Sequence, residues 1–156
     1  MLGCSFAERS CGSLVSRWAN TLSNFTKLEE VSENYRRACF EVSYLIKAQQ
    51  MSKRELPTTK VPWARLSMLV NLHTPELKGH LEAVYLAGSR MGSALGSGIM
   101  QSSADPGRNQ ALLNSLDEAL SGLDAAVDSM RKAIVTSSES LSDRAASSAG
   151  KPGAGK

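Results

Sequence analysis

Apolar residues recur every three or four positions along most of this chain, which is the spacing of a single apolar stripe on a helix. The spacing predicts a first helix from Leu14 and a second helix that restarts at Ser32 and ends near Met51. The second helix ends there because each proline in the stretch "ELPTTKVPW" disfavours helical geometry in the residue before it. The stripe residues of the two helices are Leu14, Trp18, Leu22, Phe25, Leu28, Tyr35, Cys39, Val42 and Ile46.

The next stretch, "WARLSMLVNL" at residues 63–72, has a different pattern, because its apolar residues are almost continuous. It is too short for a surface helix of that composition, so we expect a buried extended segment or a short strand. A helix start follows directly. Thr74 is expected to be the N-cap of a third helix, Pro75 its first residue, and Glu76 a favourable charge near the positive end of the helix dipole. The stripe of this helix is Leu77, Leu81, Val84, Met91 and Leu95.

Glycine is concentrated at the end of the third helix, at Gly88, Gly92, Gly96 and Gly98. The first three, spaced by four residues, would leave bare backbone on one helical face. Such a face allows either the close approach of another chain or fraying into a mobile loop. Residues 96–108, "GSGIMQSSADPGR", have the composition of a loop. Asp105 and Pro106 at the end of this loop are expected to cap a fourth helix.

The fourth helix has the clearest pattern, three heptads in which apolar residues are spaced alternately by three and four positions. They are Leu113, Leu116, Leu120, Leu123, Val127, Met130 and Ile134. Residues 137–156 are rich in Ser, Ala and Gly and are expected to form a disordered tail, and residues 1–13 a flexible arm. The predicted fold is all-α: an up-down four-helix bundle over residues 14–136, with a short extended segment before the third helix and flexible termini.

The composition fits one globular domain. The chain has 156 residues, of which 42% are hydrophobic and 21% charged, and a chain of this length can bury a sizeable core. Only 5% of the residues are aromatic, so aliphatic side chains must fill that core, which suits packed helices. The net charge of +3 permits a local basic groove but does not by itself indicate nucleic-acid binding.

The sequence contains no recognisable set of catalytic or metal-ligating residues. Three cysteines, Cys4, Cys11 and Cys39, lack metal-ligand spacing and are expected to be free thiols in a reducing cytosol. The two histidines, His73 and His80, have no carboxylate or cysteine at zinc-site spacing. None of the motifs GxSxG, GxGxxG and HExxH occurs. We therefore expect no enzymatic activity, no metal, no cofactor and no small-molecule substrate.

Signals for secretion and membrane insertion are also missing. The first residues show no basic region followed by an apolar run of about 7–15 residues, so no signal peptide is expected. No stretch approaches the roughly 18 consecutive apolar residues of a membrane span. These patterns predict a soluble intracellular protein that does not interact with a membrane.

Three segments, taken in order, give the chain a resemblance to a known family. The first is "SRWANTLSNF", followed by Arg36-Arg37 in the next helix. The second is "TKVPWARLSMLVNLHTPEL", with its "VNL..PE" core, and the third is "DPGRNQALLNSLDEALSGLDAAVDSMRKAI". Together they span roughly residues 17–135. In order and spacing they resemble the coat proteins of rod-shaped, helically built plant RNA viruses, of the tobamovirus and benyvirus kind.

The resemblance implies a function for the predicted bundle. Such coat proteins pack side by side and stack into a helical rod, with single-stranded RNA between successive turns. The expected partners are therefore copies of the same chain and single-stranded genomic RNA, and the expected locations are the virion and the host cytoplasm. The loop at residues 96–108 would line the inner channel of the rod.

The resemblance also implies that arginines near the inner half of the bundle neutralise RNA phosphates. Packaging a genome of any sequence requires contacts to the backbone rather than to base edges. The residues expected in this role are Arg36 or Arg37, together with Arg90 and Arg108. Arg90 is the strongest candidate, because the glycines around it let a backbone or a ligand come close.

Two positions depart from the family pattern. The family usually has an aspartate near the end of the third helix that pairs with the arginine of the second helix. Ser89 occupies about that place here, and Glu82 is a poor substitute for the aspartate. The Phe-Glu pair that the family tends to show after the fourth helix is replaced by "SSESLSDRAASS", so lateral packing must differ. The chain therefore resembles a divergent member of the family.

A second hypothesis is a helical adaptor or scaffold subunit of a cellular assembly. Its basis is the heptad face of the fourth helix, from Leu113 to Ile134, which could bind a partner helix. The two hypotheses make different demands on the chain. A coat protein should self-associate and carry nucleic acid, whereas an adaptor should leave the heptad face exposed until its partner binds.

Overall fold

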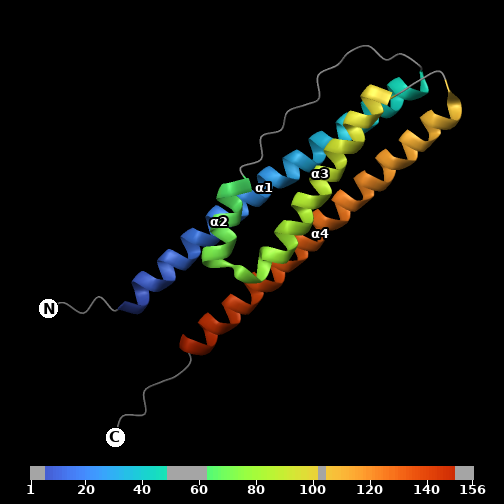
Figure 1. Ribbon diagram of the computed structural model, residues 1–156. Coiled ribbons are helices and arrows are strands. Elements are labelled where there is room, and N and C mark those ends of the chain that lie inside the picture. The colour runs from blue at the N-terminus through green and yellow to red at the C-terminus, as the bar shows by residue number, and fades with distance from the viewer. Residues whose placement is uncertain (1–5, 49–62, 102–104, 150–156) are drawn as a thin grey trace, which may run out of the picture.

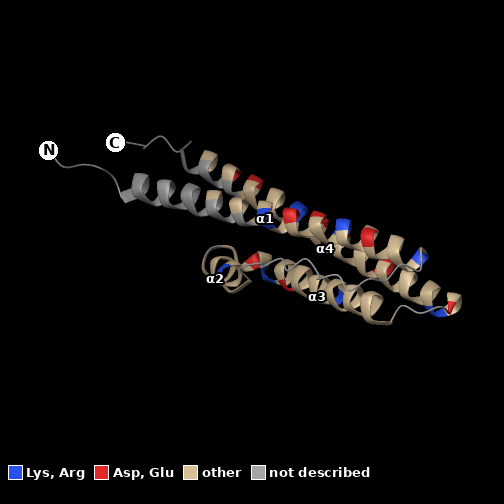
Figure 2. Cartoon of the chain, turned by 90° about the horizontal axis from the view of Figure 1, so that it is seen from above, with Lys and Arg blue, Asp and Glu red and all other residues tan. Residues whose placement is uncertain are grey.

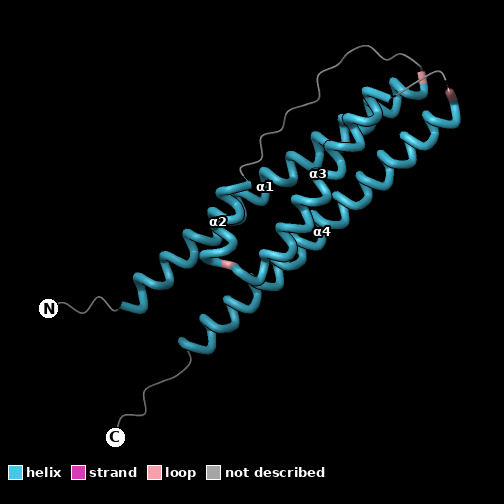
Figure 3. Tube along the Cα trace, viewed as in Figure 1, coloured by secondary structure: helices cyan, strands magenta, loops and turns pink. Residues whose placement is uncertain are grey.

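The chain folds into four helices that pack against one another, and the expected all-α fold is confirmed (Figures 1 and 3). This computed structural model describes residues 6–48, 63–101 and 105–149, and these ranges contain no strand. The elements are α1 (Phe6–Lys47), α2 (Trp63–His73), the 3-10 turn η1 (Pro75–Leu77), α3 (Lys78–Gln101) and α4 (Pro106–Ala149). α1 and α3 run in the same direction, α4 returns antiparallel to both, and the short α2 lies against α1 and α3.

α1 is one continuous helix of 42 residues, so the predicted restart at Ser32 is wrong. Ser32 is only 6% exposed, and its hydroxyl donates a hydrogen bond to the carboxylate of Asp124 on α4 at 3.4 Å. The serine therefore lies on the buried side of α1, between Leu28 and Tyr35, and continues the stripe there. A polar residue in an apolar stripe indicated a helix boundary in the sequence, but its partner on another helix makes it part of the helix interior.

The helices also reach further toward the chain ends than expected. Residues 6–13, predicted as part of a flexible arm, belong to α1, and residues 137–149, predicted as part of a disordered tail, belong to α4. Residues 1–5 and 150–156 lie outside the described residues. The serine-rich end of α4 satisfies its hydroxyls within the helix, as Ser147 does by donating to the carbonyl four residues before it at 2.8 Å.

Residues 63–73 form a helix, α2, and the expected extended segment is wrong. The apolar residues of α2 face two ways. Leu66 and Val70, one turn apart, are buried, whereas Met68 and Leu72 are more than half exposed. A continuous apolar run arises here because the helix buries one side and also carries apolar residues on the other. Periodicity alone does not distinguish this case from a buried strand.

The predicted start of a helix after α2 is confirmed in its position, but the expected N-cap residue, Thr74, makes no side-chain capping hydrogen bond. Thr74 precedes η1, Pro75 is the first residue of η1, and α3 follows directly. The Thr74 hydroxyl makes no capping hydrogen bond, and within the described part of the chain it is buried without a partner. The backbone closes the turn instead, because the amide of Leu77 donates to the carbonyl of Thr74 at 2.9 Å.

The heptad face of α4 lies against the other helices of the same chain. Six of its seven apolar residues are buried, and Leu120 is partly buried. These residues join the stripes of α1, α2 and α3 in one core. Its most deeply buried large side chains are Leu28, Ile46, Val70, Leu77, Met91, Leu95, Leu116 and Met130. The surface on which the adaptor hypothesis depends is therefore filled from within the chain.

The connection between α3 and α4 is shorter than the predicted loop at residues 96–108. α3 remains helical to Gln101 and α4 begins at Pro106, while residues 102–104 lie outside the described residues. The cap predicted at Asp105 is confirmed, because its carboxylate accepts a hydrogen bond from the amide of Gly107 at 2.9 Å. The glycine-rich end of the third helix therefore does not fray before residue 101.

Gly98 is the glycine at which the helices come closest. A methyl group built on it would lie 3.0 Å from a methyl of Val42 on α1 and 3.7 Å from Leu116 on α4. At Gly88, Gly92 and Gly96, which precede it in α3, an added methyl group would meet nothing within 4 Å. Among the described residues no other helix approaches Gly88, Gly92 or Gly96, for which the sequence left open a close approach of another chain, and the close packing occurs instead at Gly98, between helices of this chain.

Alanine substitutions at two of these glycines should have different effects. Gly92→Ala should raise the free energy of unfolding by about 0.5–1 kcal/mol, because alanine favours the helix and the space is open. Gly98→Ala gains the same propensity but must displace Val42, at a cost of about 1–3 kcal/mol. We expect Gly98→Ala to be less stable than Gly92→Ala by at least about 1 kcal/mol in urea unfolding. Equal stabilities would show that α3 does not press on α1 at this point.

Candidate functional site

Arg36 links α1 to α4 through two carboxylates. Its guanidinium lies 2.7 Å from Glu33, one turn earlier in α1, and 2.7 Å from Asp124 of α4. The hydrogen bond and the charge of Asp124, with a smaller contribution from Glu33, raise the pKa of Arg36 above its usual value. A phosphate group would have to compete with both carboxylates for this guanidinium.

Arg131 of α4 makes the reciprocal link to α1. Its Nε donates a hydrogen bond to Glu29 at 3.0 Å, and its Nη1 lies 3.1 Å from Asp128, one turn earlier in α4. Both helices carry the same pattern: an acid, a second acid four residues later, and an arginine three residues after that. These six residues, which we call the α1–α4 clamp, are Glu29, Glu33 and Arg36 on α1 and Asp124, Asp128 and Arg131 on α4.

The clamp lines an open polar groove of about 710 Å³ between α1 and α4. Figure 2 shows acidic and basic residues intermixed where these two helices run side by side. The clamp side chains are about 40–50% exposed, so each ion pair is solvated and contributes little by itself. Despite the four carboxylates, no group of three or more His, Cys, Asp or Glu in the described ranges is placed to hold a metal ion.

Two of the arginines predicted to contact phosphates, Arg37 and Arg108, are held only by one long polar contact each within the described ranges. The Nε of Arg37 lies 3.5 Å from Glu33, and its side chain is 76% exposed. Arg108, in the first turn of α4, donates a long hydrogen bond to Gln101 at the end of α3, at 3.4 Å. Both guanidiniums therefore remain largely in solvent.

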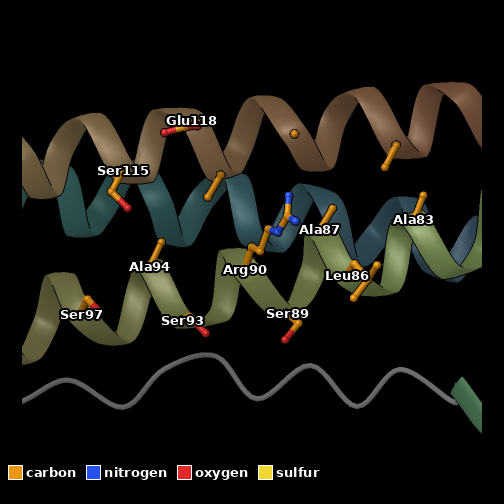
Figure 4. Close-up of a pocket in the computed structure, with 13 residues that line it drawn as sticks. Ala83, Leu86, Ala87, Ser89, Arg90, Ser93, Ala94, Ser97, Ser115 and Glu118 are labelled. Atoms are coloured by element: carbon orange, nitrogen blue, oxygen red, sulfur yellow. The ribbon is translucent and has the colours of Figure 1, made fainter.

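Arg90 lies in a second open groove, between α3 and α4, with a volume of about 680 Å³. Its side chain points from α3 toward α4, and Glu118 stands on the α4 wall (Figure 4). Across the part of the chain that the structure describes, neither residue has an ion-pair partner. Ten of the thirteen lining residues are Ala, Ser or Gly. The groove thus carries one charge of each sign above small side chains, and we call it the α3–α4 groove.

The four predicted arginines do not converge on one surface. Arg36 and Arg37 share Glu33 on α1, Arg90 lies in the α3–α4 groove, and Arg108 lies at the start of α4. The groove with the strongest candidate is therefore separate from the α1–α4 clamp. The arrangement offers individual cations on three helical surfaces rather than one basic patch.

The carboxylate that pairs with Arg36 comes from a helix that the sequence did not indicate. Ser89, at the place where the coat proteins that the sequence resembles have an aspartate, lines the α3–α4 groove, and Glu82 is exposed on α3. Asp124 of α4 makes the pair instead. The repeated spacing of acids and arginine was present in the sequence, but only the antiparallel packing of α1 on α4 shows which acid meets which arginine.

Comparisons with known proteins leave the family open. No family model matches the chain, and no curated protein or solved structure matches it. None of the helices, over the residues described, is both long enough and apolar enough to cross a membrane. The function is therefore inferred from the geometry above and from the resemblance in the sequence.

Arg36→Ala should lower the free energy of unfolding by about 1 kcal/mol, because it removes both partly solvated ion pairs of one clamp arginine. Arg37→Ala is the matched control, since it removes a longer pair at a more exposed neighbour and should change stability by no more than about 0.5 kcal/mol. Urea unfolding followed by circular dichroism measures both. Indistinguishable stabilities would mean that the clamp does not hold α1 to α4.

The fold should also lose stability in acid through Asp128. The hydrogen bond and charge of Lys132, followed by the charge of Arg131, lower the pKa of Asp128. A lowered folded-state pKa stabilises the fold above the unfolded value of about 4, and this stabilisation is lost as the pH falls through the lowered value. As the pH falls below about 4, the wild type should therefore lose stability more steeply than Asp128→Asn. Urea midpoints across this range test the difference, and parallel curves would contradict it.

Proposed function

We propose that this chain is a structural subunit that assembles with copies of itself around single-stranded RNA, in the manner of the coat proteins that it resembles. The observation that carries the proposal is the α3–α4 groove. α1 and α2 pack on α3 elsewhere, but over this groove the described chain leaves α3 and α4 uncovered. An open groove between two long helices is the kind of surface that packs against another protein.

The adaptor hypothesis receives less support from the same structure. It depends on an apolar heptad face that stays exposed until a partner helix binds. That face of α4 is buried, with Leu116 at 0% and Met130 at 2% exposure. An adaptor would have to open its own core to present these residues, and the groove on the other side of α4 offers contact without that cost.

Arg37 and Arg108 are the phosphate contacts within this proposal. Their guanidiniums are exposed, and neither makes a short ion pair. Arg36 is already held by two carboxylates, and a phosphate at Arg90 would face the carboxylate of Glu118. Two arginines per subunit suffice for packaging, because many copies on one RNA strand share the attraction.

Negative-stain electron microscopy of the purified protein tests the assembly directly. Samples with and without single-stranded RNA, near neutral and at mildly acidic pH, should contain rods or stacked disks. The acidic sample matters because crowded carboxylates between subunits would be partly neutralised there. Small discrete particles under every condition would contradict the proposed function.

The double variant Arg37→Ala/Arg108→Ala should bind single-stranded RNA more weakly than the wild type. Losing two phosphate contacts should reduce the slope of log affinity against log salt by roughly 1.4, at about 0.7 for each contact. The matched control is Arg65→Ala/Lys78→Ala, which removes the same charge from two other exposed positions and should keep the wild-type slope. Fluorescence anisotropy with labelled oligouridine at several salt concentrations gives both slopes. If the two double variants lose the same slope, Arg37 and Arg108 are not specific contacts.

A further inference from the structure

Two aromatic residues of α1, Phe40 and Tyr44, expose their rings to solvent. Phe40 is 78% exposed and Tyr44 is 61% exposed, and neither contributes to the core. The other aromatic side chains that the structure describes all have apolar neighbours; they are Phe25, Tyr35, Trp63 and Tyr85. The packing of the bundle therefore does not account for the two exposed rings.

The two rings lie in a row with two cations. Phe40 and Tyr44 are four residues apart on one face of α1, which separates them by about 6 Å along the helix axis. Arg37 lies three residues before Phe40, and Lys47 lies three residues after Tyr44. The side chain of Arg37 is 76% exposed, and Lys47 is exposed as well. Because spacings of three, four and three residues follow one side of a helix, these four residues form a single stripe, which we call the aromatic stripe.

The carboxylates of α1 that lie near the aromatic stripe are already engaged. Glu33 pairs with Arg36 at 2.7 Å and with Arg37 at 3.5 Å. Glu41 is exposed and interacts with another group of the chain. The longer of the two Glu33 pairs is the one with Arg37, so this guanidinium keeps most of its surface available to an anion.

The aromatic stripe leads toward one end of the bundle. α1 and α3 end there and α4 begins there (Figure 1). Lys47 is in the last turn of α1, and Arg108 is in the first turn of α4. A chain of phosphates that follows the stripe from Arg37 past Lys47 therefore approaches the end of the molecule that carries Arg108.

Rings flanked by cations match the chemistry of a single-stranded nucleic acid. Every base has a flat π-face that stacks on an aromatic ring whatever the sequence, and the phosphates between bases pair with cations beside the rings. An interface with another protein would instead be built around a broader apolar core, in which lysine is depleted. The two cations at the ends of the stripe thus favour a nucleic acid as its partner.

We propose that Phe40 and Tyr44 stack on two neighbouring bases of a single RNA strand, while Arg37 and Lys47 contact the phosphates on either side of them. The inference rests on the proposed function, in which Arg37 contacts a phosphate, and it adds to that contact a place for the bases and a further cation. Stacking does not read base edges, so the site accepts RNA of any sequence. Each subunit offers one such site to one strand, so the contact repeats along an RNA that is bound by many copies.

Replacing both rings by leucine in the full chain tests the site. Phe40→Leu/Tyr44→Leu keeps apolar side chains and a high helix propensity, so circular dichroism and thermal unfolding should match the wild type. The dissociation constant for a short labelled oligouridine, measured by fluorescence anisotropy at one salt concentration, should rise at least about fivefold for each ring lost. The slope of log affinity against log salt should stay at the wild-type value, because no phosphate contact is removed.

Two further variants are the controls. Phe40→Tyr/Tyr44→Phe exchanges the rings, retains both π-faces and should bind oligouridine within about twofold of the wild type. Met68→Ala/Leu72→Ala removes two apolar side chains that are also four residues apart and more than half exposed, but on α2. This variant should leave the dissociation constant unchanged.

Inorganic polyphosphate separates the bases from the phosphates, since it carries the charges of a nucleic acid without its bases. The wild type and Phe40→Leu/Tyr44→Leu should bind polyphosphate equally. Equal loss of affinity for polyphosphate and oligouridine in this variant would overturn the inference. Equal binding of oligouridine by the two proteins, or a wild type that does not bind oligouridine, would overturn it as well.

Electron microscopy of the same proteins distinguishes this inference from the proposed function. If rods form on RNA but Phe40→Leu/Tyr44→Leu binds oligouridine like the wild type, the proposed function stands and the stacking site is refuted. This holds also if the variant loses only the RNA-free disks or rods, because the rings would then lie in a contact between subunits. If oligouridine binding depends on the rings but no rods or disks form, the stacking site stands and the proposed function fails.

Discussion

The burial of α4 against α1 and α3 is the interaction on which the rest of the structure depends. The heptad residues of α4 supply the middle of the core, with Leu116 fully buried between α1 and α3, and Gly98 lets the third helix come close at the same level. Apolar burial provides most of the stability, and the interdigitation of the core side chains, tightest at Gly98, depends on how the helices are aligned. The α1–α4 clamp is consistent with the same alignment, because its solvated pairs form when Arg36 lies opposite Asp124 and Arg131 opposite Glu29.

Sequence patterns predicted the elements with strong local signals and failed where a distant partner decides. The heptads of α4 and the cap at Asp105 are local features, and both occur as predicted. Ser32 interrupts the stripe of α1 in the sequence, yet its hydroxyl is satisfied by Asp124, 92 residues away, so the helix continues. Residues 63–73 form a helix in which Leu66 and Val70 are both buried in the core. The pattern of a short apolar run does not show whether such residues belong to a helix or to a strand.

The same reasoning applies to the functional residues. The sequence indicated candidate arginines by type and position, but the partners that distinguish them come from other helices. Arg36 pairs with Asp124 of α4, whereas Arg90 faces a groove whose other wall begins at Ser115, on the next helix of the chain. The groove exists because α1 covers one side of the α3–α4 pair and the described chain places nothing on the other.

Because the helices differ in length, local stability is expected to vary along the molecule. α1 and α4 have 42 and 44 residues, and at about 1.5 Å per residue they measure roughly 63 and 66 Å, whereas α3 with 24 residues measures roughly 36 Å. The outer parts of the two long helices therefore extend past the beginning of α3 toward the chain ends (Figure 1). There a helix has fewer neighbours, and its backbone hydrogen bonds open at a lower free energy than those at the level of Leu116. Amide protons in these outer parts would exchange through local fraying, whereas those at the level of Leu116 would exchange only through global unfolding. The outer ends of α1 and α4 are therefore expected to be less stable than the centre of the bundle.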